Sequence, residues 1–220
     1  ALPHDAAAFS RLSAAIGDRP VIVAASTHEG EEIAIVRALD GLDDRVCLIL
    51  TPRHPERGPH IAQGLAREGY AFAMRSRGET IGPDTDIYLA DTLNEMGLFL
   101  RLADVVIMGG SFAPALGLPP VGGHNPLEPA RLGRPAITGP AASNWAPVTA
   151  ARNSAGGLTL VQAPSDLAAA VAPLLADPAA AKAMGDRARR AAAEAGGGLD
   201  RLWAALQPLT PPPAPKRAGR

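Results

Sequence analysis

Residues 21–39 have the sequence VIVAASTHEGEEIAIVRAL. The first five residues, 21–25, are all apolar, which is typical of a strand buried on both faces of a parallel sheet. Apolar side chains recur at helical spacing over residues 31–39, so this segment is predicted to be a helix. A strand, a short polar loop and a helix in direct succession are the repeating unit of α/β folds.

The same alternation continues along the chain. Further apolar runs predict strands at residues 46–50, 70–74, 87–90, 105–108, 135–138 and 158–161. Amphipathic segments predict helices at residues 60–67, 93–102, 127–132 and 147–153. Strands and helices in this order indicate an α/β fold with a doubly wound parallel sheet, followed by C-terminal helices.

The length of 220 residues favours one large domain between two terminal segments. Residues 1–19 are expected to be a connector or a first helix, and residues 20–207 to form the domain. The Pro-rich residues 208–220 are expected to be a disordered tail.

The sequence after residue 161 becomes rich in alanine and predicts helices. Ser165 and Asp177 have the character of N-caps, and Pro178 suits a first helical position. One helix is predicted over residues 178–195, ending at the glycines of 196–198. A short helix with Trp203 as a packing residue is expected to follow.

Charge and hydropathy exclude several classes of protein. The chain has 21 Lys and Arg against 22 Asp and Glu, a net charge of -1, which argues against a nucleic-acid-binding protein. A hydrophobic content of 47% suffices for a core and excludes global disorder. No apolar run approaches the roughly 20 residues that cross a bilayer, and no signal peptide opens the chain, so no membrane segment is expected.

The single cysteine, Cys47, lies within an apolar run and cannot form an internal disulfide. This setting favours a reducing compartment and predicts an inert packing residue. The sequence has no P-loop lysine motif, no HExxH and no CxxC. We therefore expect no metal site and no cofactor.

A doubly wound sheet binds its ligand at the carboxyl ends of its strands, so the loops there are the candidate sites. In the first loop, Ser26 and Glu29 have the spacing of a capping box. The alternative is that this loop faces an anion, because the free amides at a helix N-terminus favour phosphate. His28 fits no metal-ligand pattern and is expected to be a polar loop residue.

The loop after the second strand is cationic, with Arg53, His54 and Arg57 close together. Arg53 comes directly after Pro52 and could hold a phosphate or a carboxylate through its planar guanidinium. The alternative is an ordinary ion pair with Glu56 or a neighbouring acid.

Residues 109–128 contain two glycine pairs and then start a helix at Asn125 and Pro126. Glycine allows the backbone to approach a ligand closely. The carboxylate of Glu128, at the third helical position, could accept hydrogen bonds from a ribose diol. Alternatively, Asn125 and Glu128 form a pair that resembles a capping box.

The loop after residues 87–90 runs from Asp91 to Glu95 and could bring backbone amides or the Glu95 carboxylate to the same crevice. The alternative is that it supplies a helix N-cap.

Three blocks together closely resemble the 3-deoxy-D-manno-octulosonic acid (Kdo) transferases: residues 25–32 (ASTHEGEE), 52–57 (PRHPER) and 122–128 (GGHNPLE). Shorter matches at residues 75–76, 78–79, 103–104 and 109–111 fall in the same order. The resemblance covers residues 10 to 206, nearly the whole chain. Three blocks in the correct order and spacing are a specific signal.

The resemblance implies that residues 20–207 are the Rossmann-like, nucleotide-sugar-binding C-terminal domain of a GT-B glycosyltransferase. It implies CMP-Kdo as donor, a lipid A precursor as acceptor, and a role in lipopolysaccharide synthesis at the cytoplasmic face of the bacterial inner membrane. It implies no metal in the transfer. The family's general base is a glutamate of the N-terminal domain, which also contacts the membrane, and no segment here resembles that domain. The chain alone is therefore expected to lack the catalytic base, and no residue is assigned as catalytic.

The resemblance places Pro52 and Arg53 on the cytidine monophosphate and residues 125–128 on its ribose and phosphate. Many relatives have Met-Gly-Glu where this chain has Leu93, Asn94 and Glu95. The complete set of expected donor-binding residues is Ser26, Pro52, Arg53, Leu93, Asn94, Glu95, Gly110, Ser111, Asn125, Pro126, Leu127 and Glu128. Two alternatives stay open: another GT-B nucleotide-sugar enzyme, such as an epimerase, and a stand-alone nucleotide-binding module.

Overall fold

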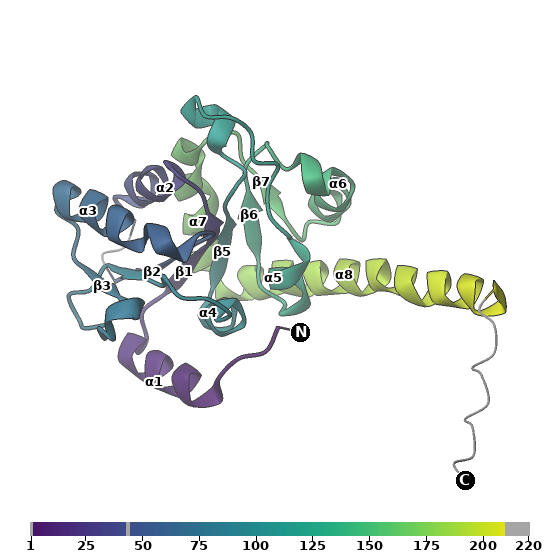
Figure 1. Ribbon diagram of the computed structural model, residues 1–220, viewed down its shortest axis with the longest axis horizontal. Coiled ribbons are helices and arrows are strands. Elements are labelled where there is room, and N and C mark those ends of the chain that lie inside the picture. The colour runs from purple at the N-terminus through teal and green to yellow at the C-terminus, as the bar shows by residue number, and fades with distance from the viewer. Residues whose placement is uncertain (1, 43–44, 210–220) are drawn as a thin grey trace, which may run out of the picture.

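The sheet has seven strands in the order β3-β4-β2-β1-β5-β6-β7, and all neighbouring strands are parallel (Figure 1). The computed structural model describes residues 2–42 and 45–209. The strands are β1 (Val21–Thr27), β2 (Cys47–Pro52), β3 (Phe72–Met74), β4 (Ile87–Leu89), β5 (Val105–Met108), β6 (Ala136–Thr138) and β7 (Thr159–Leu160). All seven predicted strands are confirmed, with shifts of at most two residues at their ends.

The strand order reverses beside β1, which pairs with β2 on one side and with β5 on the other. This is the doubly wound arrangement that the sequence predicts. In such a sheet the loops diverge at the reversal and leave a crevice at the carboxyl ends of the strands.

Helices cover both faces of the sheet, which explains why the strands are apolar without alternation. The first face packs against α2 (Glu31–Leu39), α3 (Gly58–Glu68) and α7 (Leu167–Ala176). The second face packs against α1 (Ala6–Ile16) and α4 (Met96–Leu102). Ile22, Val23 and Ala24 in the central strand are completely buried. Residues 1–19, expected as a connector or a helix, thus contain helix α1.

The remaining helices are α5 (Leu127–Arg131), α6 (Ala146–Ser154) and α8 (Pro178–Leu206). Short 3-10 turns are η1 (Pro55–Arg57), η2 (Arg75–Arg77), η3 (Ala113–Leu116), η4 (Ser143–Trp145), η5 (Pro164–Asp166) and η6 (Gln207–Leu209). The end of α8 extends far beyond the sheet (Figure 1).

Two predictions about the C-terminal helices are wrong. Helix α8 continues through the glycines of 196–198 to Leu206, because glycine keeps its backbone hydrogen-bonding groups and costs only about 1 kcal/mol relative to alanine. Ser165 is not an N-cap, since α7 begins after η5 and the Asp166 carboxylate accepts from the amides before it. Asp177 is confirmed as an N-cap, with its carboxylate accepting from two amides of α8. Most of the predicted disordered tail, residues 210–220, lies outside the described residues.

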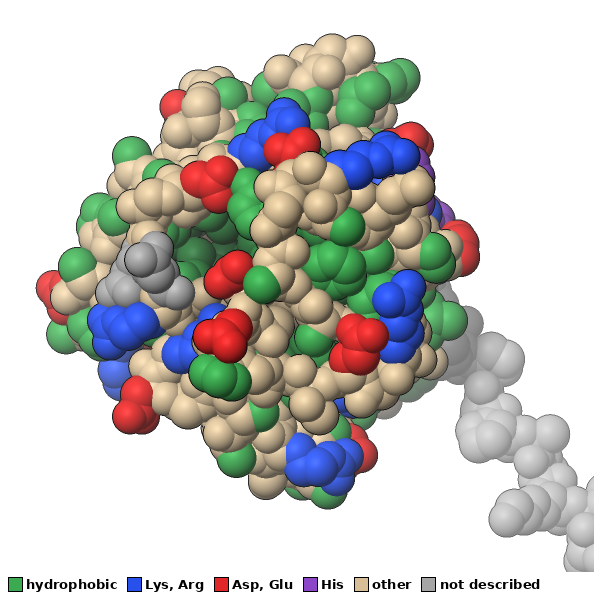
Figure 2. Space-filling view, turned by 90° about the vertical axis from the view of Figure 1, so that its left-hand side faces the viewer, with side chains coloured by type: hydrophobic (Ala, Val, Ile, Leu, Met, Phe, Trp, Pro, Cys, Tyr) green, Lys and Arg blue, Asp and Glu red, His purple; other side chains and the backbone are tan. Residues whose placement is uncertain are grey.

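Acidic and basic side chains are interspersed over the face shown in Figure 2. Within the described part of the chain, no single helix has the length and apolar character needed to cross a bilayer. The segments Pro164–Ala176 and Pro178–Glu194 meet that test only when joined across a bend of 106°.

Candidate functional site

A cavity of about 430 Å³ opens at the carboxyl ends of β1, β2 and β4. Among the expected donor-binding residues, those that line it are Ser26, Pro52, Arg53, Leu93, Asn94, Asn125 and Glu128. The other five, all within the described residues, do not line it: Glu95, Gly110, Ser111, Pro126 and Leu127. Segments far apart in the sequence thus meet where the fold predicts a ligand.

A bulge at the end of β1 directs Ser26 to this cavity. Ala25 is aligned with Thr51 and Thr27 with Pro52, so Ser26 is an extra residue between them. Its φ of 56° lies in the left-handed region, which non-glycine residues rarely adopt. The Ser26 amide donates to the Thr51 hydroxyl at 3.3 Å, which stabilises this conformation. Bulges of this kind often redirect a side chain beside a functional site.

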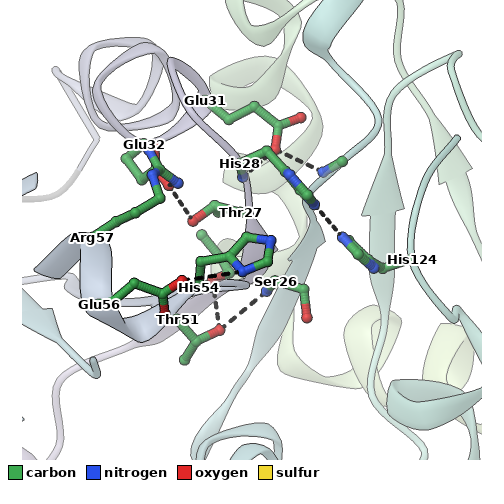
Figure 3. A network of polar contacts seen from close by, with 12 residues as sticks. Ser26, Thr27, His28, Glu31, Glu32, Thr51, His54, Glu56, Arg57 and His124 are labelled. Atoms are coloured by element: carbon green, nitrogen blue, oxygen red, sulfur yellow. Dashed lines mark hydrogen bonds and ion pairs between the residues drawn. The ribbon is translucent and has the colours of Figure 1, made fainter. Parts of the chain in front are cut away.

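The predicted capping box of Ser26 and Glu29 is wrong, because α2 begins later. Its N-cap is Gly30, in the left-handed conformation and without a side-chain cap. The carboxylate of the first helical residue, Glu31, instead accepts from three backbone amides: His28 at 2.9 Å, Gly110 at 2.7 Å and Phe112 at 2.9 Å. Figure 3 shows Glu31 beside His28. Glu31 is completely buried. Its three hydrogen bonds connect the loop after β1 to the loop after β5.

A second buried carboxylate, Glu32, holds the cationic loop in place. Arg57 donates to both of its oxygens, at 2.8 and 3.2 Å, and the Thr27 hydroxyl donates at 3.0 Å. Arg53 lies at the cavity, is exposed, and has no side-chain hydrogen bond or ion pair with any other described residue. The alternative for Arg53, an ion pair with Glu56, is not formed, since Glu56 lies 3.5 Å from Nδ1 of His54 instead. Arg53 is thus available to a ligand.

The loop between β4 and α4 is held by an ion pair on its outer side. Arg75 donates to both oxygens of Glu95, at 2.8 and 2.5 Å, and this contact lowers the pKa of Glu95. Glu95 occupies the N-cap position of α4 but makes no cap hydrogen bond. Its carboxylate is therefore an anchor for the loop.

Asn94 in this loop has a φ of 64°. Asparagine tolerates this left-handed conformation better than most residues other than glycine. Its neighbour Leu93 is 69% exposed and lines the cavity.

The segment before α5 is organised by Asn125. Its side-chain oxygen accepts from the Leu127 amide at 3.0 Å, and its side-chain nitrogen donates to one oxygen of Glu128 at 3.4 Å. Glu128 is the second residue of α5 and does not reach back to a backbone amide as a capping box requires. Burial raises its pKa, and its carboxylate lies at the cavity.

The glycine pairs bring two loops together. The Gly123 amide donates to the Gly110 carbonyl at 2.9 Å, and both residues have positive φ. Ser111 is completely buried; its hydroxyl donates to the Met108 carbonyl and accepts from the Gly139 amide. Gly110, Gly123 and Ser111 do not line the cavity, so in this structure they hold the loops around it in place.

Two histidines form a contact that sequence reasoning missed. The Nε2 atoms of His28 and His124 are 2.7 Å apart, and the two rings lie end to end, with their planes 8° apart and their centroids at 5.0 Å (Figure 3). His124 lines the cavity, and burial lowers its pKa to about 4. Both residues lie in the recognised blocks, but nothing in the sequence indicates that these blocks pair. The cavity is also lined by residues that were not expected there, among them Thr51, Thr92, Phe99, Leu2 and Pro3.

Across the described residues, no group of three or more His, Cys, Asp or Glu side chains is arranged to hold a metal ion.

Comparison with known proteins gives consistent results. No protein-family model matches the chain. The 3-deoxy-D-manno-octulosonic acid transferase of Bordetella pertussis is 37% identical over 94% of this chain and 49% of its own length. The Haemophilus influenzae transferase is 35% identical over 87% of this chain and 44% of its own length. The chain thus spans about half the length of these relatives.

One solved structure matches the whole domain. It is the C-terminal CMP-Kdo binding domain of WaaA from Acinetobacter baumannii, with a TM-score of 0.78 and 29% identity. The match covers 84% of this chain and 96% of that domain. The chain is therefore similar in sequence to 3-deoxy-D-manno-octulosonic acid transferases and similar in fold to the C-terminal CMP-Kdo binding domain of WaaA.

Proposed function

We propose that this chain is the donor-binding half of a Kdo transferase, a GT-B glycosyltransferase that moves Kdo from CMP-Kdo to a lipid A precursor in lipopolysaccharide synthesis. The observation that carries the proposal is the cavity at the carboxyl ends of β1, β2 and β4. It is lined by the half-buried Glu128 and by Arg53, which has no ion pair or side-chain hydrogen bond within the described part of the chain. The Acinetobacter baumannii domain that this chain resembles is a CMP-Kdo binding domain.

The two charged side chains divide the recognition of the nucleotide. Arg53 has a free guanidinium, which suits the phosphate because its planar donors match two phosphate oxygens. Glu128 uses one oxygen for Asn125 and keeps further acceptor capacity for the ribose hydroxyls. Leu93 and Asn94, from the loop between β4 and α4, also line the cavity.

The transfer itself needs groups from outside this chain. We propose that the general base is a carboxylate of an N-terminal domain, which also contacts the lipid acceptor at the cytoplasmic face of the inner membrane. The support is that the chain spans about half the length of its relatives. A reaction in a cleft between two domains requires both walls to align the reacting atoms.

The first test is binding and turnover by the purified chain. We expect it to bind CMP more tightly than UMP by calorimetry, and to transfer no Kdo to a lipid A precursor. Binding should be weak, because one wall of the cleft is missing. A preference for UMP would favour a different nucleotide-sugar enzyme, and transfer by this chain alone would overturn the proposed division of labour.

The second test is Glu128→Gln. If the carboxylate accepts from two ribose hydroxyls, the amide can replace only one acceptor, and CMP binding should weaken by about 1.5–3 kcal/mol, at least tenfold. The melting temperature should change little, since glutamine can still accept from Asn125. Glu68→Gln, on the far end of α3, is the control for the loss of charge. Equal CMP affinity of Glu128→Gln and the native chain would leave Glu128 with a structural role only.

A further inference from the structure

The proposed function leaves the paired histidines unused, of which His124 lines the cavity and His28 lies directly behind it, in contact with His124. Gly110 makes room for them: a Cβ atom at this position would lie 2.8 Å from Cδ2 of His124 and 3.5 Å from Cδ2 of His28. The Gly110 amide is in turn held by Glu31. The contact between the rings is thus built on the buried connection between the loops after β1 and β5.

The geometry limits the protonation states of the pair. At 2.7 Å, one Nε2 atom must donate a hydrogen bond and the other must accept it. When both rings are neutral, the accepting ring carries its proton on Nδ1, so the pair has one outward donor and one outward acceptor. After uptake of one proton, both Nδ1 atoms are donors and the pair carries a positive charge. Neither Nδ1 atom has a hydrogen-bond partner among the described residues.

Two arginines and two carboxylates lie around the pair, and of these four Arg53 is the one without an ion pair or side-chain hydrogen bond among the described residues. His124 faces Arg53 and His54, besides His28. His28 faces His54 and Arg57, and the carboxylates of Glu31 and Glu32. Both carboxylates are already used, Glu31 by three amides and Glu32 by Arg57 and Thr27. Burial lowers the pKa of both rings, and the nearby Arg53 and Arg57 act in the same direction.

We propose that the His28–His124 pair binds an anionic oxygen of the donor, in its phosphate or in the carboxylate of its sugar acid, and takes up one proton from solvent in doing so. The proposal rests on the proposed function, since it assigns a further part of the same donor. The proton shared between the two Nε2 atoms holds the rings together while their Nδ1–H groups become available to the anion. Arg53 and the pair would then hold the acidic part of the donor jointly.

The test is calorimetry with cytidine, CMP and CMP-Kdo on the native chain, His124→Gln and His28→Gln. His60→Gln is the matched control, because His60 is exposed on α3 and does not line the cavity. We expect both variants of the pair to bind cytidine as the native chain does and the anionic ligands at least tenfold more weakly, as for a lost charge-assisted hydrogen bond. If CMP and CMP-Kdo both lose affinity, the bound group is the phosphate; if only CMP-Kdo does, it is the sugar carboxylate.

Proton uptake is the readout that a structural role would not change. Titrations in PIPES and in ACES at pH 7 give the number of protons bound with the ligand. The native chain should take up about half a proton or more beyond the His124→Gln variant. The comparison with the variant is necessary because the phosphate of CMP titrates near pH 6 itself.

Two results would overturn the inference while the proposed function stands. One is unchanged affinity of both variants for CMP and CMP-Kdo; the other is an equal loss for cytidine, which would indicate a merely structural pair. Failure of the native chain to bind CMP or CMP-Kdo would overturn the proposed function as well.

Discussion

Glu31→Ala is expected to cause a large loss of stability, lowering the free energy of unfolding by about 3 kcal/mol or more. The variant leaves the buried amides of Gly110 and Phe112, and the partly buried amide of His28, without their acceptor. Each buried donor without a partner costs about 1–3 kcal/mol. Denaturant unfolding measures the loss directly. In a domain of this size the melting temperature falls by about 2–4 °C per kcal/mol.

Glu29→Ala is the matched control for this experiment. Glu29 lies two residues away, is exposed, and its side chain has no hydrogen bond to another described residue. Its removal should change stability by about 0.5 kcal/mol at most. Equal melting temperatures for the two variants would show that the Glu31 carboxylate does not hold the two loops together.

Arg53→Ala should weaken CMP binding by about 1.5–3 kcal/mol, or at least tenfold, as expected for a charge-assisted hydrogen bond. Stability should stay constant, because the Arg53 side chain has no hydrogen bond or ion pair within the described chain. Arg53→Lys should restore only part of the affinity, since the ammonium group lacks the planar pair of donors. Calorimetry measures both effects.

Arg67→Ala controls for the loss of one positive charge, because Arg67 is exposed near the far end of α3. It should leave CMP affinity unchanged. If Arg53→Ala binds CMP as tightly as Arg67→Ala does, Arg53 is an ordinary surface residue, and the phosphate is held by other groups.

The order of strands and helices could be predicted because it depends on local patterns. Each strand is a short apolar run, and each helix repeats its apolar residues at helical spacing. The ends of the helices follow less directly from local patterns. The glycines at 196–198 do not stop α8, because a helix tolerates the cost of about 1 kcal/mol that a glycine adds relative to alanine.

Seven of the expected donor-binding residues could be placed at the cavity from sequence, since the carboxyl ends of parallel strands meet at one edge of the sheet. The sequence could not separate carboxylates that face this cavity from those that anchor its walls. Glu95 and Glu128 each lie near the start of a short helix that follows a polar loop. Only the position of Arg75, 20 residues before Glu95, makes that carboxylate an anchor.

By itself, the sequence determined the α/β fold, the resemblance to Kdo transferases and the loops in which a ligand site had to lie. The tertiary structure decided the roles of individual side chains. Glu31 accepts from amides 79 and 81 residues further along the chain, and His28 meets a partner 96 residues away. Hydrogen bonds act over about 3 Å, so such a pairing depends on how the loops pack and leaves no periodic trace in the sequence.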